Sequence, residues 1–390
     1  MRNLRFPTIL VAFGLLAGAC TPSGSAGPSG LTTLPDAEDE LNLVIWVGYA
    51  EDGANFPEFD WVTPFENETG CQVNATDGVD SANMVSLMAT GQYDGVSASG
   101  DATNRMIEAG TVAPVNVALI PNYEGMFAGL KNKPHNSVDG VPYGVPHGRG
   151  ANLLLYNTDE FPEAPTSWDP VWEGAADHSG QVSIYNYLIY IADAALHLMQ
   201  KNPELGITDP YQLNQEQFDA AVALLKAQSE HATYWGTAAE QITSFQTGDA
   251  VVGTTWQYMA NNLTDSPVGV TLPAEGSTGW SDTWMISSEA EHPGCMYRWM
   301  NWMADPETSA MATIYFGEAP TSQAACDAAE TILEGAYAGH CDTFHATDED
   351  YFSKIWFWTT PREDCADEDS ATICKNIEDW TNAWTEITGA

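Results

Sequence analysis

The run Leu41-Asn-Leu-Val-Ile-Trp46 begins the alternation of strand and helix patterns that decides the fold. It is a short apolar segment bounded by polar and glycine residues, which is typical of a buried strand. Residues 71–75 and 93–98 have the pattern of two further strands, and between them Ser81 is predicted to cap a helix that ends at Gly91. This order predicts an α/β domain with a largely parallel sheet.

The alternation continues through the rest of the chain. Three more strands are predicted, over 151–156, 250–256 and 268–273. A helix with apolar positions at helical spacing is predicted over 216–228, and Asp305-Pro-Glu307 begins another that ends at Gly317. With 390 residues, 44% of them hydrophobic, the chain is too long for one core and long enough for two domains.

The charge balance excludes one class of partner. Asp and Glu number 54 and Lys and Arg number 12, so the formal net charge is −42. A surface of this sign repels phosphate backbones, and we therefore expect no nucleic-acid partner. Two interpretations of the acidic excess stay open: adaptation to a salty environment, and attraction of a cationic ligand. No apolar run after the N-terminus is long enough to span a membrane.

The N-terminus has the features of an export signal over residues 1–20. Arg2 and Arg5 form the charged start, an apolar stretch follows, and Leu16-Ala-Gly-Ala-Cys20 resembles a bacterial lipobox with one extra residue. We expect Cys20 to carry the lipid and residues 21–40 to form a flexible tether. The protein is then expected in the periplasm or on the outer cell surface, attached to the membrane only by its lipid. A plain secretory peptide is the alternative.

Six cysteines remain after Cys20 is set apart, an even number that suits disulfides in an oxidising compartment. They lack the spacing of a metal site. Six cysteines allow 15 pairings. Local spacing favours Cys326–Cys341 and Cys365–Cys374, which leaves Cys71–Cys295 as the long-range pair.

Catalytic signatures are missing from the sequence. It contains no Walker, HExxH, GxSxG or GxGxxG pattern, and Gly148-Arg-Gly150 lacks the third glycine of a dinucleotide loop. We therefore expect a binding protein that is not an enzyme and needs no cofactor or metal. An exported hydrolase that uses two of the many carboxylates is the alternative from another class.

Several short motifs follow one another in a fixed order along the chain. They are Leu43-Val-Ile-Trp-Val-Gly-Tyr49, Tyr93-Asp-Gly-Val96, Met106-Ile-Glu-Ala-Gly110, Val141-Pro-Tyr-Gly-Val-Pro146, Thr166-Ser-Trp168, Trp256, Gly279-Trp-Ser-Asp-Thr283 and the region from Asp305 to Gly317-Glu-Ala-Pro-Thr321. In this order they resemble the bacterial spermidine/putrescine-binding family, the substrate-binding components of polyamine ABC importers.

The resemblance implies a two-lobe periplasmic-binding-protein fold of type II. Each lobe would be a mixed sheet flanked by helices, and crossing strands would form the hinge. Lobe one would comprise residues 41–147 and 283–325, and lobe two residues 148–282 and 326–390. This division requires no disulfide across the cleft. The implied partners are a small solute and an ABC permease, with the protein itself a monomer.

The resemblance also implies a pocket for a small organic cation of the spermidine or putrescine kind. The matching positions are Trp46, Tyr49, Trp256, Trp280 and Asp282. Aromatic faces attract an ammonium group and bury the methylene chain, and a carboxylate pairs with the charge. Trp356 and Trp358 lie near another pocket segment of the family, whereas Trp299 and Trp302 are expected in the core.

Three departures from the family pattern concern ligand specificity. A family aromatic residue falls on Asp101, another near the hinge falls on Arg149, and the stretch 184–188 around Tyr185 lacks the family's acids. From their positions in the resemblance, Asp101, Arg149 and Tyr185 are still expected among the ligand-binding residues. Arg149 has two interpretations: it pairs with Asp101 or Asp282 to latch the closed lobes, or it binds a ligand carboxylate. The second would make the ligand a zwitterion such as an amino acid or betaine.

Overall fold

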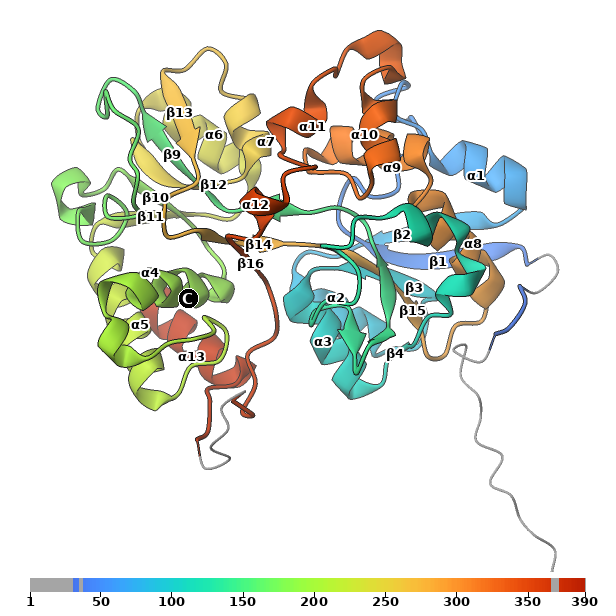
Figure 1. Cartoon of the computed structure of the whole chain (residues 1–390), viewed down its shortest axis with the longest axis horizontal. Coiled ribbons are helices and arrows are strands. Elements are labelled where there is room, and N and C mark those ends of the chain that lie inside the picture. The colour runs from blue at the N-terminus through green and yellow to red at the C-terminus, as the bar shows by residue number, and fades with distance from the viewer. Residues whose placement is uncertain (1–30, 35–37, 366–371, 390) are drawn as a thin grey trace, which may run out of the picture.

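The computed structural model of the protein describes residues 31–34, 38–365 and 372–389. The predicted signal peptide with Cys20 lies outside these residues. Figure 1 shows two α/β bodies side by side, with short strands running between them. In the described part of the chain, no helix combines the length and the apolar character needed to cross a membrane.

The first body is built on a six-stranded mixed sheet. Its strands in spatial order are β2 (Gln72–Asp77), β1 (Glu40–Ile45), β3 (Gly95–Ala98), β15 (Thr283–Ser287) and β4 (Val112–Ala113), and β7 (Gly144–Pro146) also pairs with β15. β1 is parallel to β2 and β3, as the strand–helix alternation predicts. β15 is antiparallel to β3, β4 and β7, which makes the sheet mixed.

Capping residues explain where three of the helices of this body begin. The helices are α1 (Val62–Thr69), α2 (Ser81–Met88), α3 (Gly100–Ala109), α8 (Pro293–Met303), α9 (Pro306–Phe316) and α10 (Gln323–Ala329). Asp305 caps α9 and Gly317 ends it at φ 83°, both as predicted. The predicted cap of α2 is wrong by one residue. Asp80 is the N-cap and accepts the N–H of Asn83 at 2.7 Å, while Ser81 is the first helical residue.

The second body contains a five-stranded mixed sheet. Its spatial order is β11 (Ala232–Trp235), β10 (Val182–Tyr185), β12 (Val252–Thr255), β9 (Leu153–Asn157) and β13 (Val268–Thr271). β10 is parallel to β11 and β12, whereas β9 is antiparallel to β12 and β13. The helices of this body are α4 (Ile191–Lys201), α5 (Gln215–Ser229), α6 (Ala238–Thr247), α7 (Gln257–Asn261) and α13 (Ile377–Thr388).

A three-stranded sheet lies between the two bodies, in the order β16 (Ile355–Phe357), β14 (Ser277–Trp280) and β8 (Gly150–Ala151). The chain passes from β7 to β8 through residues 147–149 and from β14 to β15 through Ser281 and Asp282. These are the crossing segments expected of the fold, and they hold Trp280 and Asp282 at the junction.

Shorter elements complete the described chain. They are β5 (Ser137–Val138), β6 (Val141–Pro142), α11 (His340–Thr343), α12 (Glu349–Phe352) and the 3-10 helices η2 (Val117–Leu119), η3 (Pro121–Gly125), η4 (Ala175–His178), η5 (Leu188–Tyr190), η6 (Pro203–Leu205) and η7 (Ile332–Gly335).

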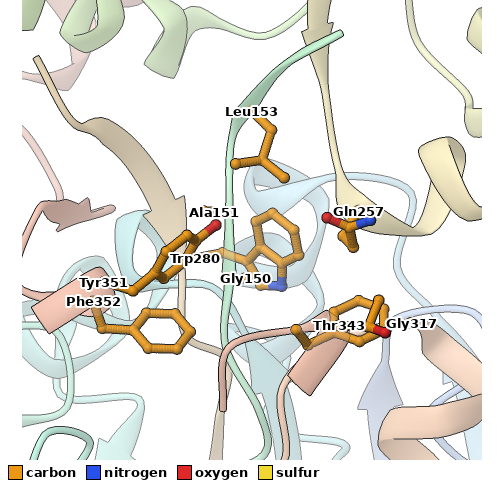
Figure 2. A pocket seen from close by; sticks show the side chains of 10 residues that line it. Gly150, Ala151, Leu153, Gln257, Trp280, Gly317, Thr343, Tyr351 and Phe352 are labelled. Carbon is orange, nitrogen blue, oxygen red and sulfur yellow. The ribbon is translucent and has the colours of Figure 1, made fainter. Parts of the chain in front are cut away.

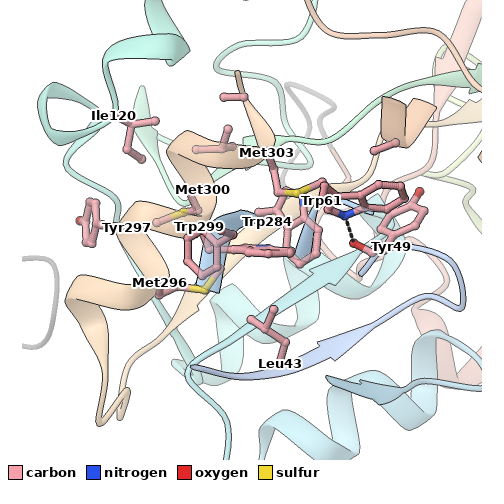
Figure 3. Close-up of a cluster of buried hydrophobic side chains, with 14 of the residues drawn as sticks. Leu43, Tyr49, Trp61, Ile120, Trp284, Met296, Tyr297, Trp299, Met300 and Met303 are labelled. Atoms are coloured by element: carbon pink, nitrogen blue, oxygen red, sulfur yellow. Dashed lines mark hydrogen bonds between the residues drawn. The ribbon is translucent and has the colours of Figure 1, made fainter. Parts of the chain in front are cut away.

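Each body has its own aromatic-rich core. In the first, Trp284 and Trp299 meet edge to face with ring centroids 5.5 Å apart, as Figure 3 shows, which confirms the prediction that Trp299 is a core residue. Trp302 packs against the same core. Ala329 on α10 also belongs to it, beyond the predicted limit of lobe one. The exact lobe boundaries stay a prediction.

All three disulfides have the pairing that spacing favours. Cys71 bonds Cys295, Cys326 bonds Cys341, and Cys365 bonds Cys374. The first joins residues 224 positions apart, against 15 and 9 for the other two. It therefore restricts the unfolded chain most.

Replacing both Cys71 and Cys295 with alanine is expected to lower the free energy of unfolding by roughly 2–5 kcal/mol. In the loop-closure model the loss exceeds that of a Cys365/Cys374 double variant by about 3 kcal/mol, because the closed loop is so much longer. Denaturant unfolding of both variants measures the difference. Equal losses would contradict the chain-entropy explanation.

Candidate ligand-binding site

The ends of parallel strands bring the candidate residues to the junction of the two bodies. Ser99 follows β3 in the first body, while Tyr185 ends β10 and Trp256 follows β12 in the second. Tyr187, just beyond β10, donates its hydroxyl hydrogen to Oδ2 of Asp101 at the start of α3. That contact shows that the two strand edges meet. Sites in open α/β sheets lie at such carboxyl ends.

Six aromatic side chains gather at this junction, and we call them the aromatic cluster: Tyr185, Tyr187, Trp235, Trp256, Trp280 and Trp358. Ring centroids of Tyr185 and Trp256 lie 5.3 Å apart, and those of Trp256 and Trp280 lie 5.2 Å apart. Tyr185 and Trp358 are parallel within 5° at 6.3 Å. The structure thus brings together three aromatic residues that the sequence predicted as ligand-binding.

Other members of the aromatic cluster were not predicted with the same clarity. Trp358 was placed only near a pocket segment, and Tyr187 and Trp235 were missed. Trp235 ends β11, the edge strand next to β10. Its position at the end of that strand is the feature that could have indicated a site residue. Trp46 is not part of the cluster. It follows β1 and packs half-buried against the cores of the first body.

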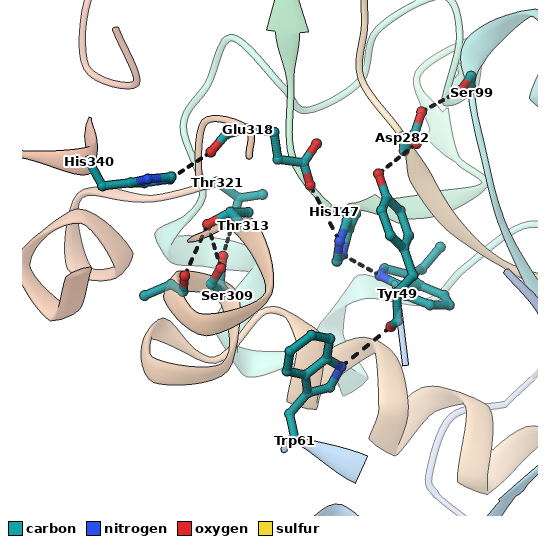
Figure 4. A network of polar contacts seen from close by, with 12 residues as sticks. Tyr49, Trp61, Ser99, His147, Asp282, Ser309, Thr313, Glu318, Thr321 and His340 are labelled. Atoms are coloured by element: carbon teal, nitrogen blue, oxygen red, sulfur yellow. Dashed lines mark hydrogen bonds and ion pairs between the residues drawn. The ribbon is translucent and has the colours of Figure 1, made fainter. Parts of the chain in front are cut away.

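Asp282 is buried and held by two hydroxyl groups of the first body. Tyr49 donates to its Oδ2 at 2.8 Å and Ser99 to its Oδ1 at 2.6 Å, as Figure 4 shows. Burial raises the pKa of Asp282 to about 6, and these two hydrogen bonds oppose the rise while the charge of Asp101 adds to it. Among the described residues, no Lys, Arg or His lies within ion-pair distance of this carboxylate.

Asp101 is the second buried carboxylate, and we call it and Asp282 the acidic pair. Besides the bond from Tyr187, Ser81 donates to its Oδ1 at 3.2 Å. Burial raises its pKa, and the hydroxyl bonds and Arg105 only partly offset this. The pKa of the Tyr185 phenol rises through burial first, then through the charges of Asp101, Asp80 and Asp282. The acidic pair and the aromatic cluster therefore form one electrostatic environment.

Glu318 is a third buried carboxylate, which the sequence did not predict as a site residue. It is fully buried, and its Oε1 lies 3.4 Å from Nε2 of His147 (Figure 4). Burial lowers the pKa of His147 to about 3, so the ring is neutral at pH 7. Burial and the charge of Asp282 raise the pKa of Glu318 well above its usual range. No local pattern in the sequence singles out Glu318, because only tertiary packing brings it to His147.

A polar chain in the second body orients Trp256. Its indole N–H donates to Oδ1 of Asn152 at 2.9 Å, and the Asn152 amide donates to Oγ1 of Thr278 at 2.6 Å. Thr278 in turn donates to Asp193 at 2.9 Å. Burial raises the pKa of Asp193 to about 7. Trp256 is therefore fixed by a buried network as well as by ring packing.

Arg149 requires a correction of the latch interpretation. It is 1% exposed, and its Nη2 donates to the carbonyl of Ala346 at 2.9 Å and to Oε1 of Glu349 at 3.2 Å. Its guanidinium lies 3.5 Å from the centroid of the Phe352 ring. It pairs with neither Asp101 nor Asp282, because Ala346, Glu349 and Phe352 hold its guanidinium group instead.

Replacing Arg149 with methionine is expected to lower the free energy of unfolding by about 1–3 kcal/mol, because the Ala346 carbonyl loses its donor. Glu349→Gln is the control. Glu349 is 57% exposed, so removing its charge should cost less than about 1 kcal/mol. Affinities for cationic and carboxylate-bearing solutes should change by the same factor. A loss confined to carboxylate-bearing solutes would restore the zwitterion interpretation.

The cavity beside Trp280 is small in this structure (Figure 2). It is lined by Gly150, Ala151, Leu153, Gln257, Trp280, Gly317, Thr343, Phe344, Tyr351 and Phe352. Its volume is about 10 Å³, enough for one water molecule and far less than a solute pocket needs. The junction is thus closely packed in the form seen here.

Two α/β bodies joined by crossing strands, with acidic and aromatic side chains gathered where they meet, are the architecture of periplasmic solute-binding proteins. The chain belongs to the family of bacterial extracellular solute-binding proteins, whose family model matches residues 60–335. A curated relative, the putrescine/agmatine-binding protein of Pseudomonas aeruginosa, is 24% identical over 296 residues, which cover 70% of this chain and 79% of the relative.

Solved structures share the fold across nearly the whole chain. The spermidine/putrescine ABC transporter substrate-binding protein PotD of Streptococcus pneumoniae matches with a TM-score of 0.66 at 18% identity, covering 90% of this chain and 98% of that one. The Tp0655 (TpPotD) lipoprotein of Treponema pallidum matches with a TM-score of 0.64 at 18% sequence identity. The match covers 90% of this chain and 99% of that one. MotA of A. tumefaciens B6 in complex with glucopine matches with a TM-score of 0.62 at 15% sequence identity. The match covers 89% of this chain and 99% of that one.

These matches confirm the resemblance to the spermidine/putrescine-binding family and the predicted fold class. They also confirm that the protein is not an enzyme, since its relatives are binding proteins.

Proposed function

We propose that the protein captures a small organic cation of the polyamine kind between its two lobes and delivers it to an ABC permease. Lobe one would comprise residues 41–147 and 283–325, and lobe two residues 148–282 and 326–390. A lipid on Cys20 would hold the protein at the outer face of the membrane. The names of the relatives support the solute class, and the chemistry of the junction supports it independently.

The acidic pair is the observation that carries this proposal. Asp101 and Asp282 are 0% and 2% exposed, and each accepts hydrogen bonds from two hydroxyl groups. Burying a carboxylate is costly, which is why burial raises both pKa values. The charge of Arg105 only partly offsets this at Asp101, and among the described residues no cation pairs with Asp282. A bound ammonium group would supply the missing charge. Glu318 adds a third acid to the same environment and suits a ligand with more than one positive charge.

The aromatic cluster supplies the other requirement of such a ligand. An ammonium group over a Trp or Tyr face gains about 0.5–2 kcal/mol, and methylene groups are buried against the rings. Tyr185, Trp256 and Trp280 would form these walls. Tyr49 would act through its bond to Asp282, and Arg149 by holding the segment 346–352 in place. Trp46 would contact the solute only from the side of the first body.

The packing of the junction supports a mechanism in which the lobes close on the solute. Contacts between the bodies include Tyr187 with Asp101, and Thr360, whose hydroxyl donates to the Asp101 carbonyl at 2.5 Å. The cavity beside Trp280 is too small for a solute, so entry requires the lobes to separate. The described form would then correspond to the closed state, and solute capture to hinge motion.

A thermal-shift panel tests the proposal. At a hundredfold excess over Kd, a ligand stabilises the folded state by about 2.7 kcal/mol, which corresponds to a rise in Tm of about 3–4 °C for a chain of this length. Putrescine, agmatine and spermidine should raise Tm and be recovered unchanged. A rise with amino acids or betaines alone would favour the zwitterion alternative, and a chemical product would favour the hydrolase.

A further inference from the structure

A second cluster of charged side chains lies in the second body, outside the ligand-binding junction. Asp169, His197 and Glu275 each offer one ligand atom, and these atoms lie within 4.8 Å of one another. They come from the loop after β9, from α4 and from the loop between β13 and β14. His197 is fully buried, whereas both carboxylates are partly exposed to solvent.

His197 is oriented by a fourth residue. Its Nε2 lies 2.9 and 3.0 Å from the two carboxylate oxygens of Glu173, while its buried Nδ1 makes no hydrogen bond with any described residue. Metal-binding histidines typically have one ring nitrogen held by a carboxylate in this way, which leaves the other nitrogen for the metal. An unbonded buried nitrogen in a group of acids is otherwise unfavourable.

Glu275 is held in a similar manner. Its Oε1 accepts hydrogen bonds from the Ser167 hydroxyl and from the backbone N–H of Trp168, the latter at 3.2 Å. Its Oε2 is buried and has no hydrogen-bond partner among the described residues. One oxygen is therefore fixed by the protein and the other is left for a further ligand.

The charges of the cluster do not balance. Asp169, Glu173 and Glu275 carry three negative charges, against one positive charge on Lys201, whose Nζ is 2.5 Å from Oδ1 of Asp169. That hydrogen bond chiefly raises the Lys201 pKa, with the charges of the three acids adding to it. Lys201 is 38% exposed and can turn into solvent. A divalent cation would neutralise the acids more completely.

We propose that Asp169, His197 and Glu275 bind a divalent transition-metal ion of the zinc class, with Glu173 as the positioning residue for His197. An imidazole with two carboxylates suits zinc, nickel or copper, whereas calcium and magnesium prefer oxygen ligands alone. Lys201 occupies the site in the absence of metal. A bound ion would join three segments of the second body, including the loop that leads through β14 to Trp280. The three ligands are far apart in sequence, which is why spacing predicted no metal site.

This proposal is tested by measuring zinc binding to the full chain. The protein is first treated with EDTA to remove bound metal and then dialysed. Zinc should raise Tm and compete with a chromophoric chelator, whereas calcium should do neither. Glu173→Gln should weaken zinc binding by about 10–100-fold, and His197→Asn by more. Lys201→Met should strengthen it, because the competing ammonium group is gone. His231→Asn is the control, since His231 bonds Ser179 and is not part of the cluster.

Two results would overturn the assignment. The first is that the wild-type protein does not bind zinc. The second is that the wild type, His197→Asn and Glu275→Gln bind zinc with the same affinity. Glu275→Gln keeps the proposal testable if the buried His197 variant fails to fold. Because no polyamine enters the assay, its result is separate from that of the ligand panel.

Discussion

Replacing Asp282 with asparagine is expected to reduce polyamine affinity by more than about 100-fold. The substitution keeps the shape of the side chain and removes the charge. Loss of one partner from a buried ion pair costs about 3–5 kcal/mol, and each 1.4 kcal/mol is tenfold in Kd. Isothermal titration with spermidine and putrescine measures the loss. Unchanged affinity would show that Asp282 does not face the ligand.

The pH dependence of binding gives a second test of the same residue. Because the pKa of Asp282 is about 6 in the described form, a cation that binds there must displace a proton from it below that pH. Wild-type affinity should therefore fall as the pH decreases below about 6, by up to tenfold per pH unit for one proton. The Asp282→Asn variant should lack this component. If affinity depends on pH in the same way in the wild type and in the variant, the displaced proton comes from another group.

The free energy of unfolding without ligand should depend on pH in the opposite direction to the binding affinity. The pKa of Asp282 is higher in the folded protein than its ordinary value of 3.8. The folded state then holds the proton more tightly, so this group stabilises the fold at low pH and that contribution is lost as the pH rises through about 6. The Asp282→Asn variant should be more stable than the wild type, by a margin that grows from about pH 4 to pH 6.

Asp193→Asn is the matched control for these measurements. Asp193 is also buried, and its pKa is raised to about 7, but it bonds Thr278 and not the acidic pair. Its variant should show a stability margin that grows up to about pH 7 and should retain polyamine binding. A loss of binding as large as that of the Asp282 variant would mean that the network behind Trp256 dominates affinity.

Strands and helix ends could be predicted because their signals are local. The apolar run at Leu41 gives β1, and the Asp305 cap and Gly317 stop give both ends of α9. The α2 cap was misplaced by one residue because Asp80 and Ser81 are adjacent and both can accept a backbone N–H. In the fold, Ser81 uses its hydroxyl for Asp101 instead, a contact that no local pattern reveals.

The site could be predicted only where motif order fixes the position of a residue. Trp256 follows β12 and Trp280 ends β14, and their ring centroids lie 5.2 Å apart, so the two residues that motif order selected are neighbours. The partner of Arg149 could not be predicted, because Glu349 is 200 positions away and only tertiary packing brings them together. The same holds for Glu318 and His147. Side-chain pairs of this kind depend on how the crossing segments pack, which hydrophobic periodicity does not encode.

Replacing Gly100 with alanine is expected to prevent full closure of the lobes. Gly100 begins α3 in the first body, and a Cβ atom there would overlap the backbone carbonyl of Trp358, which follows β16. A backbone atom of the joining sheet cannot move aside as a flexible side chain can. The helix itself tolerates alanine, which is a better helix former than glycine. Saturating ligand should therefore leave the variant more open than the wild type.

Small-angle scattering and titration together distinguish this effect from simple misfolding. The wild type should become more compact with ligand, whereas the Gly100→Ala variant should change less and bind at least about tenfold more weakly, because only its open form is accessible. The new Cβ would also lie 2.7 Å from Cβ of His135, so a small loss of Tm is expected in the absence of ligand. Gly125→Ala is the control, because a Cβ there meets no atom within 4 Å. Normal compaction and affinity in the Gly100 variant would show that solute binding does not require the close contact at Trp358.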